Sequence, residues 1–400
     1  MEYKTYKLGT CFSLIENGAI IKQRKEAKGF PITRIETLSH GKFNRDKLGH
    51  ADIFDTTPYK RYILEDKDLI MSHINSRAFL GRTVLYRKKG NEQIIHGMNV
   101  LRIKTNEQFL DPVFASYLFK TSHFKKAIDS IRKDAINQSS INIFDICNIQ
   151  ISLPSITEQR KISHALQLID KKIETNHLIN DNLEAIAKQL YDYWFVQFDF
   201  PNEEGKPYKS SGGAMVWNEK LKREIPKEWM ASNYTDLFTI GNGQTMPQNE
   251  GLVPAYGGNG IVKMVEISNY PACIIIGRVG ANCGSIHYSK VPCWVSDNAI
   301  SICSKNDDWQ PFLFYSLKLY NLSKNKGGSS QPLITHEALK HLYFPMSEKH
   351  INQFCHIVNE LQDLIYSNQQ EILKLTKQRD ELLPLLMNGQ ATVNYHLSDN

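Results

Sequence analysis

The feature that most constrains this chain is an internal duplication, because each half must then fold as a copy of one unit. Asp68–His73 opens a strand-like stretch that reaches Gly81, and Ala272–Arg278 opens a similar stretch that reaches Gly284. Further matches follow in the same order along the chain: Asn99 with Asn298, Asp111-Pro112 with Gln310-Pro311, Gln138-Ser139-Ser140 with Ser329-Ser330-Gln331, and Ile151–Pro154 with Leu342–Pro345. The offset between partners drifts from 205 to 191 residues, as loop insertions would cause.

Each half combines short strand-like runs, bounded by Gly, Pro and Asn, with a long helix at its end. We therefore predict an α+β protein in which two mixed α/β domains form an internal pseudo-two-fold repeat. Two long helices forming an antiparallel coiled coil separate these domains. The predicted bounds are 1–154 for the first domain, 155–198 for the first helix, 199–346 for a linker and the second domain, 347–390 for the second helix and 391–400 for a tail.

The two helices are predicted from capping and heptad signals. Ser155 with Glu158 forms a capping box after Pro154, and the second helix is expected to stop at Pro384 and Gly389. Polar seam residues favour one register over others. The alternative is two ordinary helices, each buried in its own domain. The predicted seam residues are Ile162, Leu166, Ile169, Ile173, Asn176, Asn180, Leu183, Ala187, Leu190, Ile351, Phe354, Val358, Leu361, Ile365, Asn368, Ile372, Leu375, Arg379 and Leu382.

Charge is distributed unevenly along the chain. Residues 1–152 hold 25 Lys and Arg against 16 Asp and Glu, whereas residues 153–200 hold 5 against 7. A basic surface attracts a polyanion, although an uneven surface charge can also have no functional role. The polar N-terminus and the short apolar runs, such as Ala272–Ile276, predict a cytoplasmic protein. The seven cysteines contain no C-x-x-C pair and are predicted to be reduced, buried and free of metal.

Motifs for catalysis are not found in the sequence. The glycine-rich runs 241–243, 256–260 and 277–284 have neither a P-loop ending nor dinucleotide-binding spacing. The histidines have no metal-ligand spacing of the H-E-x-x-H kind. We predict no catalytic, cofactor-binding or metal-binding residue. The glycines either bring the backbone close to a ligand or form turns between strands, and their spacing does not separate the two.

Two blocks of sequence resemble a known family. The stretch Leu153–Ile162, the helix through Asn182–Ala187 and the run Trp194–Asp199 are similar to the central region of specificity subunits of type I restriction–modification enzymes. Gly205–Gly213 and Arg223–Trp229 are similar to the lead-in to that family's second recognition domain. The second repeat departs from the pattern, because Ser347–Gln353 stands where the first has Thr157–Ile162. This departure puts equal affinity for a partner at the two ends in doubt.

The resemblance implies a subunit that reads DNA and does not itself catalyse. Each domain would be a target recognition domain that binds one half of a bipartite, asymmetric site in double-stranded DNA, with the helices setting the gap. Two methyltransferase subunits would dock on the helices, and motor-nuclease subunits would join them in the full restriction complex. S-adenosylmethionine, ATP and Mg²⁺ would be held by those partners and not by this chain.

Candidate DNA contacts follow from residue chemistry. Phosphates attract Lys and Arg, whereas base edges in the major groove accept Arg at guanine and Asn or Gln at adenine. Any one of these side chains can equally be a solvated surface residue. The candidates are Lys22, Arg24, Lys25, Arg34, Lys42, Arg45, Arg77, Arg82, Asn242, Gln244, Gln248, Tyr256, Asn259, Arg278, Asn282, Lys324 and Lys326.

Two further hypotheses concern particular residues. The aromatic cluster Trp194, Phe195 and Phe198 either docks the methyltransferase or seats the helix on the following domain. Between residues 201 and 345 the only arginines are Arg223 and Arg278, so the second half-site is predicted to depend less on guanine than the first. The competing functions are a two-headed coiled-coil scaffold without DNA readout, and a standalone modification or restriction enzyme.

Overall fold

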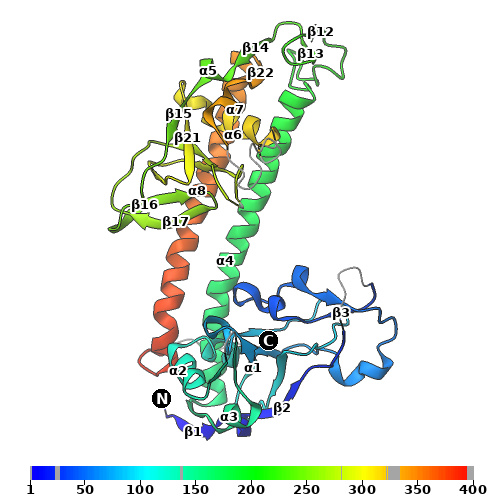
Figure 1. Ribbon diagram of the computed structural model, residues 1–400, viewed down its shortest axis with the longest axis vertical. Helices are drawn as coiled ribbons and strands as arrows, with labels where there is room; N and C mark the ends of the chain where they lie inside the picture. The colour runs from blue at the N-terminus through cyan, green and yellow to red at the C-terminus, as the bar shows by residue number, and fades with distance from the viewer. Residues whose placement is uncertain are drawn as a thin grey trace. The chain divides into compact units, whose positions relative to one another are not determined.

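The computed structural model describes residues 2–22, 28–135, 138–280, 282–320, 322 and 334–393. The chain divides into two compact units (Figure 1). The first unit comprises Met1–Ile173 and Leu373–Asn400, and the second comprises Glu174–Ile372. Each unit therefore holds one globular domain together with part of each long helix, a division that differs from the predicted bounds because the helices pair along their length.

The core of the first unit is a four-stranded antiparallel sheet in the order β2-β8-β5-β7. Its strands are β2 (Phe12–Asn17), β8 (Val100–Thr105), β5 (Leu69–Ser72) and β7 (Thr83–Leu85). A separate antiparallel pair joins β1 (Lys4–Lys7) to β11 (Gln150–Leu153). Helices α1 (Pro112–Leu118), α2 (Ser122–Ser130) and α3 (Ile143–Asn148) complete the main core. Thr121 and Asn142 cap α2 and α3 by accepting hydrogen bonds from Phe124 N and Asp145 N.

Residues 18–67 of the first unit form a long, irregular insertion between β2 and β5. It contains little regular sheet and folds over a small apolar core that includes Ala19, Ile32, Ala51 and Ile95. Its elements are β3 (Pro31–Ile32), β4 (Gly49–His50) and the 3₁₀ helices η2 (Ile35–Gly41), η3 (Arg45–Lys47) and η4 (Thr57–Tyr62). The remaining short elements of the unit are η1 (Leu8–Cys11), η5 (Arg77–Phe79), β6 (Ile74–Asn75), β9 (Lys133–Asp134) and β10 (Ser139–Ser140).

The second unit repeats this plan. Its four-stranded sheet has the order β15-β21-β18-β19, with strands β15 (Phe238–Asn242), β21 (Ala299–Ser304), β18 (Cys273–Gly277) and β19 (Ile286–Ser289). An antiparallel pair again leads to a long helix, here between β14 (Met230–Asn233) and β22 (Tyr343–Met346). The helical elements of the domain are α5 (Tyr234–Leu237), η7 (Asp307–Trp309), α6 (Gln310–Leu319) and α7 (His336–Lys340). A lead-in hairpin pairs β12 (Met215–Asn218) with β13 (Arg223–Pro226).

The insertion of the second unit is a regular hairpin. Strand β16 (Glu250–Gly257) pairs antiparallel with β17 (Gly260–Val265) and parallel with β20 (Trp294–Val295). The hairpin closes through the two residues Gly258 and Asn259, with Gly260 at a φ of +94°. The two units thus share one strand order and differ in the segment inserted before β5 and before β18.

Equivalent backbone hydrogen bonds confirm the duplication. In the first unit, Gly81 N donates to Ser72 O at 2.8 Å and Ile141 N donates to His73 O at 3.0 Å. In the second unit, Gly284 N donates to Gly277 O at 2.8 Å and Ile334 N donates to Arg278 O at 3.1 Å. The match of Gly81 with Gly284 is therefore a match in structure as well as sequence. The predicted match of Gln138–Ser140 with residues 329–331 involves residues outside the described part of the chain.

The long helices are α4 (Ile156–Tyr191), which continues into a π-helical turn (Asp192–Val196), and α8 (Glu348–Met387). They pair antiparallel, because the α8 partner number falls as the α4 number rises. In the second unit Asn176 Nδ2 donates to Glu371 Oε2 at 2.7 Å and Asn368 Nδ2 donates to Asn180 Oδ1 at 2.9 Å. In the first unit Arg379 Nη1 donates to Asp170 Oδ1 at 2.9 Å.

The predicted seam lies along these contacts. All of its α4 residues are buried or half-buried, and so are its α8 residues except Leu382, which is exposed. The seam prediction is wrong at Leu382 because the end of α8 turns Leu386 and Met387 into the core of the first unit instead. The three seam asparagines bond across the helix pair, so polar groups at these positions penalise other registers.

The predicted stop at Pro384 is also wrong, because α8 continues through it to Met387. Proline removes one main-chain hydrogen bond and its ring crowds the carbonyl four residues earlier, but α8 continues for only three residues beyond it. The stop comes at Gly389, whose φ of +70° is left-handed, and Gln390 N donates to Leu385 O at 2.8 Å. This bond is the six-to-one closure of a Schellman-type cap.

Candidate nucleic-acid interface

The turn of the β16–β17 hairpin packs against two loops of the sheet, and we call this site the strand-end junction of the second unit. Gly258 O accepts a hydrogen bond from Ser285 Oγ. Arg278 N donates to Asn298 O at 2.9 Å, which joins the loop after β18 to the turn before β21. A Cβ placed on Gly258 would lie 3.9 Å from Asn282 Cβ. The junction thus gathers side chains from positions 259, 278, 282 and 298 on neighbouring loops.

Glycines at this junction allow backbones to approach one another. A Cβ on Gly277 would lie 2.5 Å from Asn282 O and 2.8 Å from Gly258 O, so no other residue fits without displacing main chain. A Cβ on Gly243 would likewise collide with Ser296 O. The glycines of this unit therefore bring chain segments together, and through that packing they fix the spacing of the exposed amides around them.

The first unit has the same junction with different side chains. Ala19 N donates to His96 O at 2.8 Å, as Gln244 N donates to Val295 O at 2.9 Å in the second unit. Ala19 bridges Gly97 in parallel, as Gln244 bridges Ser296. Thr33 Oγ1 accepts a bond from Gly97 N at 2.8 Å, which places Arg34 directly beside the junction. In both units the junction lies at the end of the sheet where β8 or β21 begins. The other end of that strand leads to α1 in the first unit and to α6 in the second.

Most described candidates of the second unit lie at or near this junction. Asn259, Arg278 and Asn282 lie at the junction, and Gln244 is held nearby by its main-chain hydrogen bond to Val295 O. Asn242 ends β15 beside them, and Gln248 is exposed in the approach to β16. Lys324 and Lys326 fall outside the described residues. Asn298 was missed by the sequence reasoning, although its match with Asn99 in the duplication singles out the position.

Tyr256 is a correction, because its ring is buried. It belongs to a small core with Cys273, Ile275 and Val295, and burial raises the pKa of its hydroxyl to about 12. Its position beside a glycine-rich turn suggested a ligand contact, but the alternation of β16 directs the ring inward. Tyr256 therefore supports the strand from beneath and is not positioned to contact DNA.

Some candidates of the first unit are exposed to solvent, and others are bound to groups within the domain. Lys22, Arg34, Lys42 and Arg77 are exposed, whereas Arg24 and Lys25 fall outside the described residues. Arg82 is half-buried, with its guanidinium carbon 4.2 Å from the ring centre of Phe79 and Nη1 donating to Leu38 O at 3.4 Å. Arg82 thus ties the insertion to the sheet.

Arg45 is a further correction. Its Nε donates to Glu92 Oε2 at 2.9 Å and its Nη2 donates to Glu92 Oε1 at 2.5 Å. The bidentate pair holds the pKa of the Glu92 carboxyl at about 2, and Tyr86 donates to the same carboxylate at 2.9 Å. Because the partner lies 47 residues away in sequence, this use of the arginine was not visible in the chain. Arg45 is occupied within the domain and is not free to contact phosphate.

Sequence reasoning also missed a buried ionic network in the first unit. Arg102 Nε donates to Asp68 Oδ2 at 2.7 Å, and Arg102 Nη1 donates to Arg61 O at 2.8 Å. Arg61 in turn pairs with Glu16 at 2.7 Å. Burial raises the pKa of Asp68 despite the neighbouring Arg102. This network fastens the last turn of the insertion to the sheet, and so holds the first junction in place.

Two buried histidines lie at the first junction. His96 is fully buried, and its Nε2 lies 2.8 Å from Val100 O. Burial lowers the pKa of His96 to about 4, and it also lowers the pKa of His73. Both imidazoles are therefore neutral at pH 7 and serve as framework, because neither reaches the surface.

The aromatic cluster at the end of α4 is internal. Trp194, Phe195 and Phe198 are buried. The ring centre of Phe195 lies 4.9 Å from that of Phe312 and 5.3 Å from that of Phe354. Arg223, one of the two arginines of this domain, stacks on Phe198 with its guanidinium carbon 4.3 Å from the ring centre. The proposed docking role of these aromatics is wrong, since a partner cannot contact them without unfolding the domain. They seat the helix on the second unit.

The part of the helix pair that lies in the second unit presents an apolar face to solvent instead. Ile179, Ile186 and Tyr193 are exposed on α4 at steps of seven residues, and Ile357 and Leu364 are exposed on α8 at the same step. Each of Ile179, Ile186, Ile357 and Leu364 precedes a seam residue by one position, so on an antiparallel pair these side chains point to the same side. We call these five residues the outer apolar strip.

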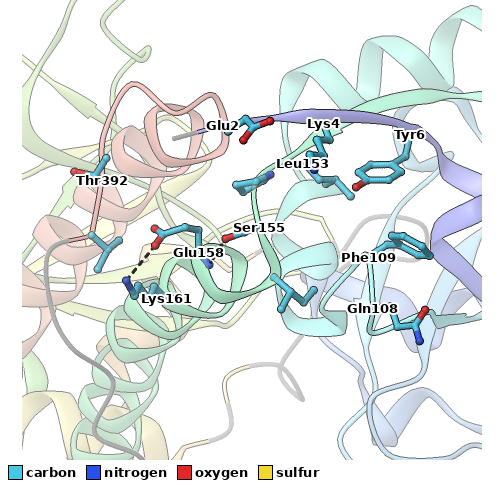
Figure 2. Close-up of a pocket in the computed structure, with 13 residues that line it drawn as sticks. Glu2, Lys4, Tyr6, Gln108, Phe109, Leu153, Ser155, Glu158, Lys161 and Thr392 are labelled. Carbon is cyan, nitrogen blue, oxygen red and sulfur yellow. Dashed lines mark hydrogen bonds and ion pairs between the residues drawn. The ribbon is translucent and has the colours of Figure 1, made fainter.

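A cavity of about 620 Å³ lies where α4 begins, between β1, β11 and residues Thr392 and Val393 (Figure 2). Ser155 Oγ accepts a bond from Glu158 N at 3.3 Å, and Lys161 Nζ pairs with Glu158 at 3.0 Å. Tyr6 and Phe109 form the other wall, with ring centres 5.4 Å apart. Ser155 thus caps the start of α4, where Glu158 and Lys161 pair in the first turns of the helix.

Among the described residues, no three His, Cys, Asp or Glu side chains are placed to hold a metal ion. None of the described helices combines the length and apolar character needed to cross a membrane. Of the cysteines, Cys11, Cys273, Cys283, Cys293 and Cys355 are buried as predicted, while Cys147 and Cys303 are half-buried.

Comparison with known proteins finds one family. The model described as type I restriction modification DNA specificity domain matches residues 1–185 and 226–382. The putative type I restriction enzyme MjaX specificity subunit of Methanocaldococcus jannaschii is 27% identical over 413 residues, which cover 98% of this chain and 94% of that protein. The HindI specificity subunit of Haemophilus influenzae is 26% identical over 204 residues, covering 50% of this chain and 42% of that protein.

A solved structure has the same fold. The type I restriction-modification S subunit from M. genitalium superposes with a TM-score of 0.60 at 18% identity, and the match covers 96% of each chain. The two-unit plan described above is therefore the fold of a protein already named for restriction–modification.

Proposed function

This chain belongs to the family of type I restriction–modification DNA specificity subunits, and from that premise we propose that its two recognition domains each bind one half of a bipartite site in double-stranded DNA. The observation that carries the proposal is the repeated strand-end junction. One fold presents polar side chains at the same place twice, with Arg34 beside the junction in the first unit and mainly amides in the second. A repeated reader with different side chains suits a target whose halves have different sequences.

The helices are proposed to set the gap between half-sites. Helix α4 has 36 residues, which corresponds to about 54 Å at 1.5 Å per residue. Half-sites about one helical turn apart present the same groove to a repeated reader. The seam asparagines support this role, because their hydrogen bonds across the helix pair resist sliding of one helix along the other.

The outer apolar strip is proposed as part of the surface on which a methyltransferase subunit docks. Five large exposed apolar side chains, four of them on one side of the helix pair, are unusual for a surface that only water contacts. In this proposal the chain itself is not catalytic. S-adenosylmethionine for methyl transfer, and ATP and Mg²⁺ for cleavage, belong to two methyltransferase subunits and to motor-nuclease subunits. The scaffold alternative predicts the same docking without DNA recognition.

The experiment that tests the proposal maps methylated adenine in genomic DNA. A methylation-free bacterium would express this chain with the methyltransferase encoded beside it, and single-molecule sequencing would read the modified bases. We expect methyl-adenine at a two-part motif with a fixed gap, absent when this chain is omitted. If the two proteins co-purify and yet no methylated motif appears, the scaffold hypothesis replaces the hypothesis of a DNA-recognition subunit.

A further inference from the structure

The strand-end junction of the second unit combines three exposed amide side chains with one half-buried arginine. Asn259 forms the hairpin turn, and Asn282 and Asn298 come from the two loops packed against it. Arg278 is the one arginine there, since Arg223 is held on Phe198 and on Val196 O at 2.7 Å. Amide side chains pair with the N6 and N7 edge of adenine, so this set favours A·T pairs.

Exposed branched apolar residues accompany the amides. Ile261 and Val262 follow the hairpin turn directly and remain 56% and 63% exposed, and Val279 follows Arg278 and is 37% exposed. Single exposed apolar residues are common on proteins and need no explanation. Ile261 and Val262 belong to β17, just after the turn that holds Asn259, and Val279 belongs to the loop that holds Asn282, so exposed apolar residues accompany the amides on both segments.

The surface is held rigid before any ligand arrives. Gly277 lets the main chain of β18 pack against Gly258 O and Asn282 O, and Gly260 adopts the left-handed φ that the tight turn requires. His287 stands behind this turn, with its Cε1 3.4 Å from the place a Cβ on Gly260 would occupy. The spacing between the turn that holds Asn259 and the loop that holds Asn282 is therefore set by backbone packing.

Only one base edge offers both an amide partner and an apolar group. An A·T pair presents the adenine N6 and N7 edge and the thymine C5-methyl group together in the major groove, whereas a G·C pair has no methyl. We infer that the second recognition domain reads A·T pairs in the major groove, with Asn259 and Asn282 on adenine edges and Ile261 with Val279 on thymine methyl groups. This inference rests on the proposed function and names the chemistry of its second half-site.

Replacing thymine by uracil removes the methyl group and nothing else, so it tests the inference directly. The full chain in complex with its methyltransferase would be titrated by fluorescence anisotropy with duplexes that carry the mapped target. Uracil in the second half-site should weaken binding about fourfold for each contacted thymine, because one methyl-sized group contributes about 0.8 kcal/mol and 1.4 kcal/mol is tenfold. Uracil in the first half-site serves as the matched DNA control.

A substitution then assigns the effect to a residue. Ile261→Ser should weaken binding of the thymine duplex and make the protein insensitive to uracil. Leu252→Ser is the matched control, because Leu252 is fully exposed near the other end of the same hairpin and should keep the response of the unchanged protein. Both side chains are on the surface, so both variants are expected to fold.

The outcomes separate this inference from the proposed function. Specific binding that ignores uracil in the second half-site, or an Ile261→Ser protein that still responds to uracil, would overturn the inference alone. A second half-site without any A·T pair would do the same. Failure of the complex to prefer its mapped target over unrelated DNA would remove the proposed function, and the inference with it.

Discussion

Where β2 pairs with β8, the first unit places Glu16 opposite Arg102, and at the equivalent step between β15 and β21 the second unit places Gly241 opposite Ser301. Both layers are buried, but one holds an ionic network and the other contains small side chains beside Cys273 and Ile275. The strand order is nevertheless the same. Topology in this fold therefore does not depend on the chemistry of that layer.

The two insertions explain the difference. In the second unit the β16–β17 hairpin satisfies its own backbone groups, so it needs little help from the sheet. In the first unit the strands among the described residues of the insertion are two residues long, and side chains attach the insertion to the sheet. Arg102 does so by bonding Arg61 O, while Asp68 accepts from Glu65 N at 2.7 Å. Regular backbone pairing in the second unit and buried ion pairs in the first are thus two ways of holding the insertion in place.

Removing Arg102 should give the largest effect that tests this comparison. Arg102→Met leaves the buried Asp68 without its arginine partner, which costs about 3–5 kcal/mol of unfolding free energy. Hydrogen exchange in urea, read separately for peptides of the two units, would report the loss in the first unit. Ser301→Ala is the matched change in the second unit and should cost less than about 1 kcal/mol, because Ser301 Oγ has no hydrogen-bond partner among the described residues. Equal losses would show that the network is not what holds the first insertion.

Acid should lower the stability of the first unit through His96. Its pKa is about 4 when folded and about 6.5 when unfolded, so the stability it contributes is complete above pH 6.5 and is lost as pH falls toward 4. The loss amounts to about 3 kcal/mol, at 1.36 kcal/mol for each unit of pKa. The position equivalent to His96 is Val295, which does not titrate.

The measurement compares the chain with a His96→Gln variant by hydrogen exchange between pH 7 and 4.5. The variant should be less dependent on pH in peptides of the first unit and unchanged in those of the second. His350, whose pKa is also about 4, supplies the background acid response of the second unit in both proteins. An identical pH dependence of the first unit in the two proteins would contradict the assignment to His96.

The smallest expected effect concerns guanine. Arg34 and Arg77 are the exposed arginine candidates of the first unit, whereas the second junction has Arg278 alone. Replacing guanine by 7-deazaguanine removes the N7 acceptor and should cost about 1–3 kcal/mol where an arginine contacts it. We expect the larger total loss for the first half-site, and the same loss should disappear in Arg34→Ala or Arg77→Ala. A second half-site composed mainly of guanine and cytosine would break this part of the comparison.

The sequence by itself determined the duplication, the two long helices and most of their seam, because periodic apolar residues and matched motifs are local signals. It also placed Asn259, Arg278 and Asn282 among the candidates. Only the tertiary structure decided which candidates are available. Arg45 is bonded to Glu92, the ring of Tyr256 lies in a core, and the aromatics after α4 face Phe312 and Phe354. These contacts join residues distant in the chain, and their partners are fixed by folding and not by spacing.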